Sequence, residues 1–229
     1  MLATLAELGW AEQDADTGFY RLTMRLAILG QHFYVATGIA DICHPLLDIL
    51  AARSGGFARL AIVDGGTLTW VADAQGATGS ILYQPMLGIN TVPLYVTATG
   101  KAWLSFLPRE VALQHVLKSG FKKGRFGPNV IGYLEKLMAE LGSTAKRGFG
   151  LAVNEAEPSV FAVATVICAE ATGVALGTVS IAGPRVRMTA HRGEELGAVV
   201  IQAAAELASL WPLRPCSSKP LNRRDFAEA

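Results

Sequence analysis

The chain carries few charged residues and almost no net charge. Its 229 residues include 20 Lys and Arg against 19 Asp and Glu, which gives a formal net charge of +1. The chain therefore lacks a global basic field that would attract nucleic acid, and any DNA contact would have to come from a local patch. Charged residues make up 17% of the chain, below the ordinary share of about 25%. Small residues must cover much of the surface, which is typical of chains that hide part of it in an oligomer interface.

Cysteine is scarce, and features that direct a chain out of the cytoplasm are missing. Cys43, Cys168 and Cys216 are odd in number, and no two of them form a C-x-x-C pair. We therefore expect free thiols in a reducing compartment. The N-terminus lacks the basic stretch of a signal peptide, and no uninterrupted apolar run reaches the roughly 18 residues of a membrane helix. These absences predict a soluble, cytoplasmic protein with no membrane partner.

Catalytic and cofactor motifs are also missing. The four His are far apart and lack the spacing of a metal site. No Ser or Cys lies in a G-x-S-x-G elbow, and no glycine-rich loop with a Lys is available for phosphate. Glu155 and Glu157 are interpreted as part of a solvated loop rather than as an acid/base pair. We expect neither an enzyme nor a bound cofactor or metal.

The segment from Val92 to Trp103 is the most informative part of the chain. Its first residues alternate like a half-buried strand. Thr97 and Thr99 are residue types that cap helices, and apolar residues follow them at helical spacing. A helix start carries unpaired backbone N–H groups and a positive dipole end, so it can hold a small anion if it faces a cavity. The segment therefore predicts a receptor for a small anionic molecule, although a capped helix start that packs tightly at Gly100 is the structural alternative.

Periodicity divides the chain into four parts. Residues 1–22 are expected to form a short helix and a hairpin, the back half of a winged helix-turn-helix. Residues 23–37 form an amphipathic linker helix, residues 38–211 a larger domain, and residues 212–229 a disordered tail. Asp64-Gly-Gly66 is the clearest hairpin turn of the larger domain. Because hairpins imply antiparallel pairing, we expect an α+β domain in which helices pack against an antiparallel sheet.

The pattern also predicts the elements of the larger domain. Strands are expected at residues 57–63, 67–72, 80–86, 91–96, near 151, 160–168 and 174–182, and helices at 41–53, 97–106, 108–117, 130–144 and 189–210. Asn129 is the expected cap of the helix that follows it. Trp70 and Tyr83 are interpreted as core residues, and Lys101 as a residue that faces solvent or pairs with an acid.

Four segments stand out by their order and spacing along the chain. They are Leu2-Ala-Thr-Leu-Ala-Glu-Leu-Gly-Trp10 with Phe19-Tyr-Arg-Leu-Thr23, then Met24-Arg-Leu-Ala-Ile-Leu-Gly30, then Pro93-Leu-Tyr-Val-Thr-Ala-Thr-Gly-Lys-Ala102, and finally Arg147-Gly-Phe-Gly150 with Ser180-Ile-Ala-Gly-Pro184. Together they resemble the IclR (isocitrate lyase regulator) family of bacterial transcription factors. The first matches the family's recognition-helix end and wing, the second its linker helix, and the third its P-L-h-x-T-A-x-G-K-A signature.

The resemblance implies a GAF-like domain that binds a small effector, in a homodimer or tetramer whose linker helix couples this domain to a DNA-binding head. Family effectors are commonly small carboxylates or aromatic acids. With Thr97 and Gly100 of the helix start, the family's pocket positions give a predicted effector site made of Ile81, Thr97, Ala98, Thr99, Gly100, Asn154 (or its neighbour Val153), Val163, Ser180 and Ala182. Relatives often place an acidic group where this chain has Val153 and Asn154. Relatives with Cys at the position of Val163 or a second Ser at the position of Ala182 have a more polar pocket. We therefore expect a less polar or bulkier effector here, such as an aromatic acid.

Two functions remain open at this point. One is a regulator of the IclR type, whose effector modulates DNA binding through a winged helix that continues upstream of residue 1. The alternative is a stand-alone small-molecule sensor or oligomerisation domain that has lost DNA binding. Residues 1–22 carry four acids against one base, and these are Glu7, Glu12, Asp14 and Asp16 against Arg21. This balance has the wrong sign for contact with phosphate.

Overall fold

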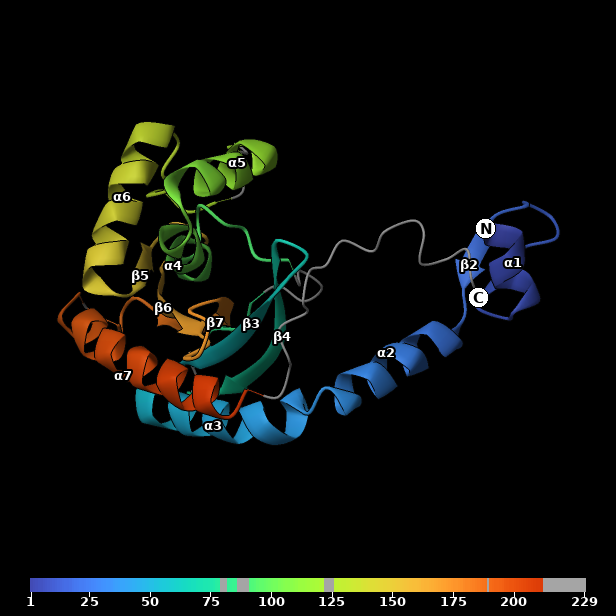
Figure 1. Cartoon of the computed structure of the whole chain (residues 1–229), viewed down its shortest axis with the longest axis horizontal. Coiled ribbons are helices and arrows are strands. Elements are labelled where there is room, and N and C mark those ends of the chain that lie inside the picture. Colours follow the sequence, from blue (N-terminus) through green and yellow to red (C-terminus); the bar gives the residue numbers. More distant parts are fainter. Residues whose placement is uncertain (79–81, 86–90, 122–125, 189, 212–229) are drawn as a thin grey trace.

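A five-stranded antiparallel sheet forms the centre of the structure, which is a computed structural model (Figure 1). The structure describes residues 1–78, 82–85, 91–121, 126–188 and 190–211. The strands of the sheet are β3 (Phe57–Asp64), β4 (Thr67–Gln75), β5 (Gly150–Val153), β6 (Val160–Cys168) and β7 (Ala175–Pro184). Their order is β4-β3-β7-β6-β5. The first strand of this sheet, β3, therefore pairs with the last, β7, and Arg59 of β3 lies opposite Ser180 of β7.

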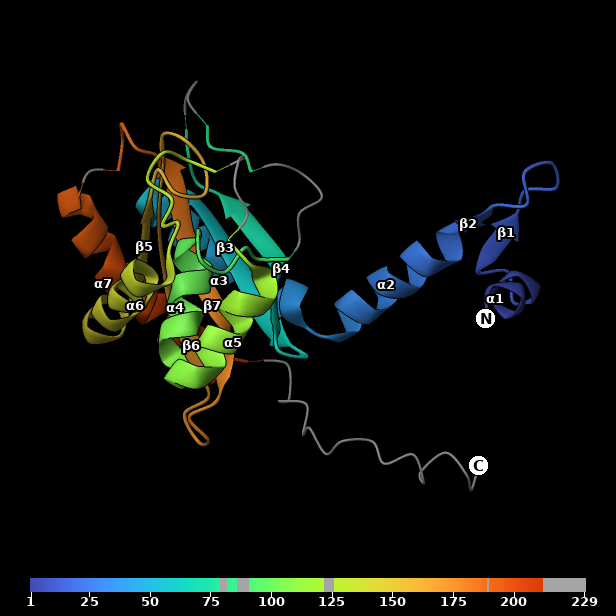
Figure 2. The same cartoon turned by 90° about the horizontal axis from the view of Figure 1, so that it is seen from above.

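Helices cover both faces of this sheet (Figures 1 and 2). On one face lie α3 (Ile39–Ser54) and α7 (Ala190–Ser209), and on the other lie α4 (Ala98–Phe106), α5 (Arg109–Ser119) and α6 (Leu134–Arg147). The main hydrophobic core lies under α3 and α7 and includes Leu47, Leu60 and Ile181. Burial of these large aliphatic side chains supplies most of the driving force that holds the two layers together.

The other face of the sheet brings α4 unusually close to the strands. Ala98 and Ala102 of α4 pack against Ala152 and Ala164 of the sheet. A Cβ atom added at Gly150 would lie 2.5 Å from the carbonyl oxygen of Ala98. These small residues let the start of α4 lie directly against the strands, and this arrangement positions the site described below.

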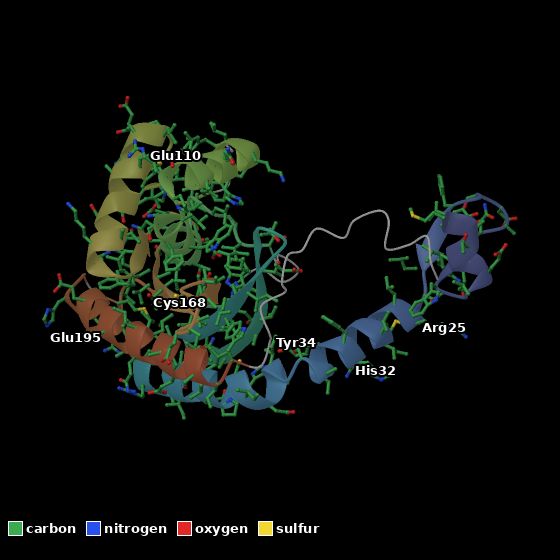
Figure 3. All side chains as sticks on the ribbon, in the orientation of Figure 1. Arg25, His32, Tyr34, Glu110, Cys168 and Glu195 are labelled. Carbon is green, nitrogen blue, oxygen red and sulfur yellow. The ribbon has the colours of Figure 1, made fainter. Side chains whose placement is uncertain are left out.

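The N-terminal residues lie apart from the sheet. They form α1 (Leu2–Glu7) and a hairpin of β1 (Ala11–Gln13) and β2 (Tyr20–Leu22), followed by α2 (Met24–Ala36). This is the helix, hairpin and second helix that the sequence predicts. No residue of α2 is buried, and the helix extends away from the sheet (Figure 2). Arg25 at its start donates to the carbonyl of Leu8 (3.0 Å), and Tyr34 near its end packs on the main core. The side chains of α2 between these two residues are not buried (Figure 3).

The predicted α+β antiparallel architecture is confirmed, but the predicted strand at residues 91–96 is wrong. Thr91 makes an isolated bridge to Thr69, and the residues that follow form a turn. Pro93 has no N–H to donate to a strand ladder. Its carbonyl instead accepts a hydrogen bond from the hydroxyl of Thr97 (2.7 Å). The chain therefore turns sharply into α4 rather than entering it from the sheet.

Two further boundaries differ from the prediction. The helix expected from residue 130 begins at Leu134, and Asn129 does not cap it, because its side-chain amide donates to the carbonyl of Val153 (3.0 Å). The strand expected at residues 80–86 falls partly outside the described residues, and residues 82–85 are not a strand. Among the described helices, none is by itself long and apolar enough to cross a membrane. Only α2 and α3 taken together meet that length and composition, and they are bent by 70° at their junction.

Candidate ligand-binding site

A cavity lies between the start of α4 and the strands β3, β6 and β7. Its volume is about 510 Å³, within the range of roughly 300–1,000 Å³ that is usual for small-molecule sites. Apolar side chains make most of its wall, among them Pro85, Pro93, Val96 and Val160. The polar groups are few and come from the first turn of α4, the sheet, Tyr83 in residues 82–85, and the loop between β5 and β6. The cavity suits a small ligand with an apolar body and one polar group.

The first turn of α4 presents backbone donors to this cavity. Thr97 is the N-cap, and its hydroxyl oxygen accepts from the amide of Gly100 (2.9 Å). The helix itself offers no acceptor to the amide groups of Ala98 and Thr99, and no acceptor for them occurs among the described residues. Both residues line the cavity. The helix start therefore leaves two N–H groups and a positive dipole end beside the empty volume.

Five of the nine predicted site residues line this cavity. They are Thr97, Ala98, Thr99, Ser180 and Ala182. Gly100, Asn154 and Val163 are not among the lining residues, and Ile81 lies outside the described residues. The structure therefore brings together the helix start and β7 as the sequence predicts, and it excludes the other three from the wall.

The three excluded residues are each held elsewhere by the backbone. Val163 points to the opposite face of the sheet, where it is completely buried in the main core, and its neighbour Ala162 lines the cavity instead. Gly100 packs on the backbone of Leu94, since an added Cβ would lie 2.4 Å from the Cα of Leu94. Asn154 adopts a left-handed conformation with a φ of 54°, and its backbone N–H donates to the carbonyl of Val160 (2.8 Å).

The cavity also contains polar residues that the sequence analysis did not assign to it. These are Arg59 and Trp70 from the β3–β4 hairpin, Tyr83, and Glu157 from the β5–β6 loop. The guanidinium of Arg59 stacks on the indole of Trp70, with its Cζ atom 3.8 Å from the ring centroid. The Tyr83 hydroxyl donates to Oε1 of Glu157 (3.1 Å). Burial, followed by the charge of Glu157, raises the pKa of Tyr83 well above its ordinary value, so the hydroxyl keeps its proton.

Trp70 and Tyr83 were predicted to be core residues. Trp70 does pack against a buried cluster, but both residues also line the cavity, which the prediction missed. One signal in the sequence could have found the site. Arg59 is the single charged residue in an otherwise apolar run from Phe57 to Val63. A charge in the middle of a strand that is buried on both faces needs a reason, and here the reason is a cavity.

Comparison with known proteins identifies the family. The profile described as "Bacterial transcriptional regulator IclR C-terminal" matches residues 31–209. The chain belongs to the IclR family. It is 30% identical over 168 residues to the HTH-type transcriptional regulator XynR of Escherichia coli K12, which covers 73% of this chain and 65% of XynR. The chain therefore spans just under two thirds of the length of that relative.

Solved IclR structures share the fold. The crystal structure of the Thermotoga maritima IclR superposes with a TM-score of 0.71 at 26% identity, covering 92% of this chain and 83% of that chain. An IclR homologue from Microbacterium hydrocarbonoxydans, solved as a complex with 4-hydroxybenzoate, superposes with a TM-score of 0.66 at 20% identity. That match covers 90% of this chain and 81% of the homologue. The predicted membership of the IclR family is confirmed.

The IclR-type signature of this chain buries its lysine. The side chain of Lys101 is 1% exposed, and its Nζ donates to Oε1 of Glu155 (2.6 Å) and to the carbonyl of Leu151 (2.8 Å). Burial raises the pKa of Glu155, and the charge of Lys101 opposes this shift. The loop with Glu155 and Glu157 was predicted to be solvated, and this is wrong. The ion pair ties the first turns of α4 to the loop that delivers Glu157 to the cavity.

Metal binding finds no support in the described residues. Across residues 1–78, 82–85, 91–121, 126–188 and 190–211, no group of three or more His, Cys, Asp or Glu side chains is placed to hold a metal ion. Cys43 and Cys168 are free thiols, and burial raises the pKa of Cys43 to about 11, which keeps it an unreactive thiol.

Proposed function

We propose that this chain is a ligand-responsive transcriptional regulator of the IclR type, in which a small carboxylate or aromatic acid modulates DNA binding. The observation that carries the proposal is the cavity at the start of α4, with the amide groups of Ala98 and Thr99 beside it. Its apolar walls favour an aromatic acid, a ligand class that includes the 4-hydroxybenzoate of the Microbacterium homologue. The predicted effector residues that line the cavity form the binding site in this proposal.

The proposed mechanism is a shift between two arrangements of the molecule. Residues 38–211 form the effector domain, residues 23–37 the linker helix, residues 1–22 part of a winged helix, and residues 212–229 a tail. Effector binding favours one arrangement of the domain, and the linker helix transmits this preference to the spacing of two DNA-binding heads. The two arrangements must differ in effector affinity by about 1–3 kcal/mol for the response to matter.

The charge of the hairpin favours a second candidate, a sensor that does not bind DNA. Arg21, the base of residues 1–22, pairs with Glu12 (2.7 Å), and Asp14 accepts hydrogen bonds from the turn at the hairpin tip. The hairpin thus offers little positive charge to a phosphate backbone. The nucleotide sequence upstream of Met1 separates the two candidates. An in-frame continuation that encodes two more helices supports the regulator, and a stop codon supports the sensor.

We predict that Thr99→Tyr abolishes effector binding. Thr99 lines the cavity and is 4% exposed, so a tyrosine ring at this position fills the volume that the ligand needs. Isothermal titration of the purified chain against small aromatic and aliphatic acids measures the effect. Ser143→Tyr is the matched control, because Ser143 lies on the exposed surface of α6. Saturable binding that is unchanged in Thr99→Tyr would place the ligand somewhere other than this cavity.

The bare surface of α2 supports a homodimer or tetramer. Leu26, Leu29 and Phe33 recur at helical spacing on α2, and all three are exposed, with Phe33 72% exposed. An apolar stripe of this kind on a projecting helix is typical of a surface that a second copy covers.

We predict that Phe33→Glu weakens self-association of the chain. A charge at this position would have to be buried in the proposed α2 interface, where it has no partner. Sedimentation velocity at several concentrations measures the change. Gln31→Glu adds the same charge at an exposed polar position of α2 and should leave assembly unchanged. If Phe33→Glu assembled like Gln31→Glu and the wild-type protein, α2 would not be the interface.

A further inference from the structure

Arg59 is the basic residue among those that line the cavity. It lies in the middle of β3, directly opposite Ser180 of β7, so the two side chains point to the same face of the sheet. Trp70 holds the guanidinium from one side at 3.8 Å, and the ring of Phe57 lies 5.9 Å from it. The stacked arrangement fixes the cation in advance, so that little side-chain entropy remains to be lost when a ligand binds.

Arg59 forms no ion pair with the described residues, although Asp73 lies directly opposite it on β4. None of the ion pairs found there includes it, and its Nε atom is buried without a hydrogen-bond acceptor. Burial lowers the pKa of Arg59, while the nearby groups Tyr83, Asp73 and Glu157 oppose this shift. An arginine nevertheless stays charged. A half-buried cation without a hydrogen-bonded partner is unfavourable unless something else supplies the negative charge.

The remaining polar groups around Arg59 are mostly donors. The indole Nε1 of Trp70 is also buried without an acceptor, and Ala98 and Thr99, whose backbone amides have no acceptor within α4, line the same cavity. Glu157 is the carboxylate of the wall, and its Oε1 atom already accepts from Tyr83. Two buried donors of the wall, Arg59 Nε and Trp70 Nε1, therefore lack an acceptor, and an incoming carboxylate would supply one.

We propose that Arg59 anchors the carboxylate of the effector and so makes the cavity selective for a monocarboxylic acid over its neutral analogues. The inference rests on the effector site proposed above and adds to it the residue that binds the charged group of the ligand. The first turn of α4 contributes its amides to the same anion, and the apolar walls take the hydrocarbon body. No carboxylate of the described residues forms an ion pair with this cation, so the carboxylate of the ligand supplies the direct partner.

The test compares acids with their amides. Benzoate, 4-hydroxybenzoate and phenylacetate are titrated into the full chain by calorimetry, each beside its primary amide, which has nearly the same shape without the charge. The wild-type protein should bind the acid about 10- to 100-fold more tightly than the amide, as expected for a charge-assisted hydrogen bond. Arg59→Met should remove this preference by weakening the acid alone. Arg59→Lys should fall between the two, because lysine keeps the charge but not the planar stack.

Arg53→Met is the matched control, since Arg53 is exposed on α3, and it should keep the full preference for acids. Equal affinity of wild-type protein for acids and amides would overturn the role of Arg59 and leave the cavity as a binding site. Equal weakening of both in Arg59→Met would also overturn it, by showing that only packing was lost. Failure of every acid and amide to bind the wild type would overturn the proposed effector function as well. The wild-type comparison needs no variant, so it decides the question even if Arg59→Met does not fold.

Discussion

Replacing Lys101 by methionine is expected to lower the free energy of unfolding by about 3–5 kcal/mol, because it leaves Glu155 as a buried carboxylate without a partner. Lys101 is among the largest fully buried side chains of the chain, and its two hydrogen bonds go to Glu155 and to the carbonyl of Leu151. Methionine has a similar length and keeps the packing of the aliphatic stem. Urea unfolding followed by tryptophan fluorescence measures the change.

The loss should grow with pH. Burial already raises the pKa of Glu155 in the wild type, and the charge that opposes this shift is gone in Lys101→Met. The folded variant then holds a proton that the unfolded chain releases, so this contribution to stability is present at low pH and is lost as the pH rises. Unfolding at about pH 5 and about pH 8 should show the smaller loss at the lower pH.

Two controls identify the cause. The double variant Lys101→Met with Glu155→Met should recover much of the lost stability, since it removes both charges from the interior. Arg21→Met breaks the exposed pair with Glu12 and should change the free energy of unfolding by only about 0–1 kcal/mol. A stability of Lys101→Met close to that of the wild type would contradict a buried pair. We also expect weaker effector binding, because this pair positions the loop that carries Glu157.

The sequence predicted much of the fold, and five of its nine predicted site residues line the cavity. Thr97 caps α4 as its residue type predicts, and the Asp64-Gly-Gly66 turn correctly predicted the antiparallel pairing of β3 with β4. The choice between Val163 and Ala162 could not be made in this way. A shift of one residue in a strand moves a side chain to the opposite face, and the family position did not fix which face of β6 meets the cavity.

Contacts between residues that are far apart in the sequence could not be predicted from local sequence patterns. Glu155 lies 54 residues from Lys101, so adjacent charges in its own loop looked solvated. Arg59 and Trp70 face each other only because β3 and β4 pair with a register shift after Leu60. The sequence did show that Arg59 is a single charge in an apolar strand, and that observation was sufficient to suspect a cavity.

A methyl group at Gly100 is expected to destabilise the protein clearly. A Cβ atom there would lie 2.2 Å from the carbonyl oxygen and 2.4 Å from the Cα of Leu94. Both are backbone atoms of the turn that leads into α4, and this turn is tied to the helix by the bond from Thr97 to Pro93. Neither side can yield without moving the N-terminus of α4. We expect Gly100→Ala to cost at least about 1–3 kcal/mol, the usual range for overpacking, despite the better helix propensity of alanine.

Gly142→Ala separates this clash from helix propensity. Gly142 lies in α6 with nothing within 4 Å of an added Cβ, so alanine there should stabilise the protein by about 0.5–1 kcal/mol. The two variants make the same chemical change in two helices, and opposite signs in urea unfolding would isolate the contact with Leu94. Gly100→Ala should also weaken binding of aromatic acids, because a displaced helix start no longer presents the amides of Ala98 and Thr99 to the cavity. If Gly100→Ala stabilised the protein as Gly142→Ala does, the close approach of Leu94 to α4 would be wrong, and with it the geometry on which the cavity depends.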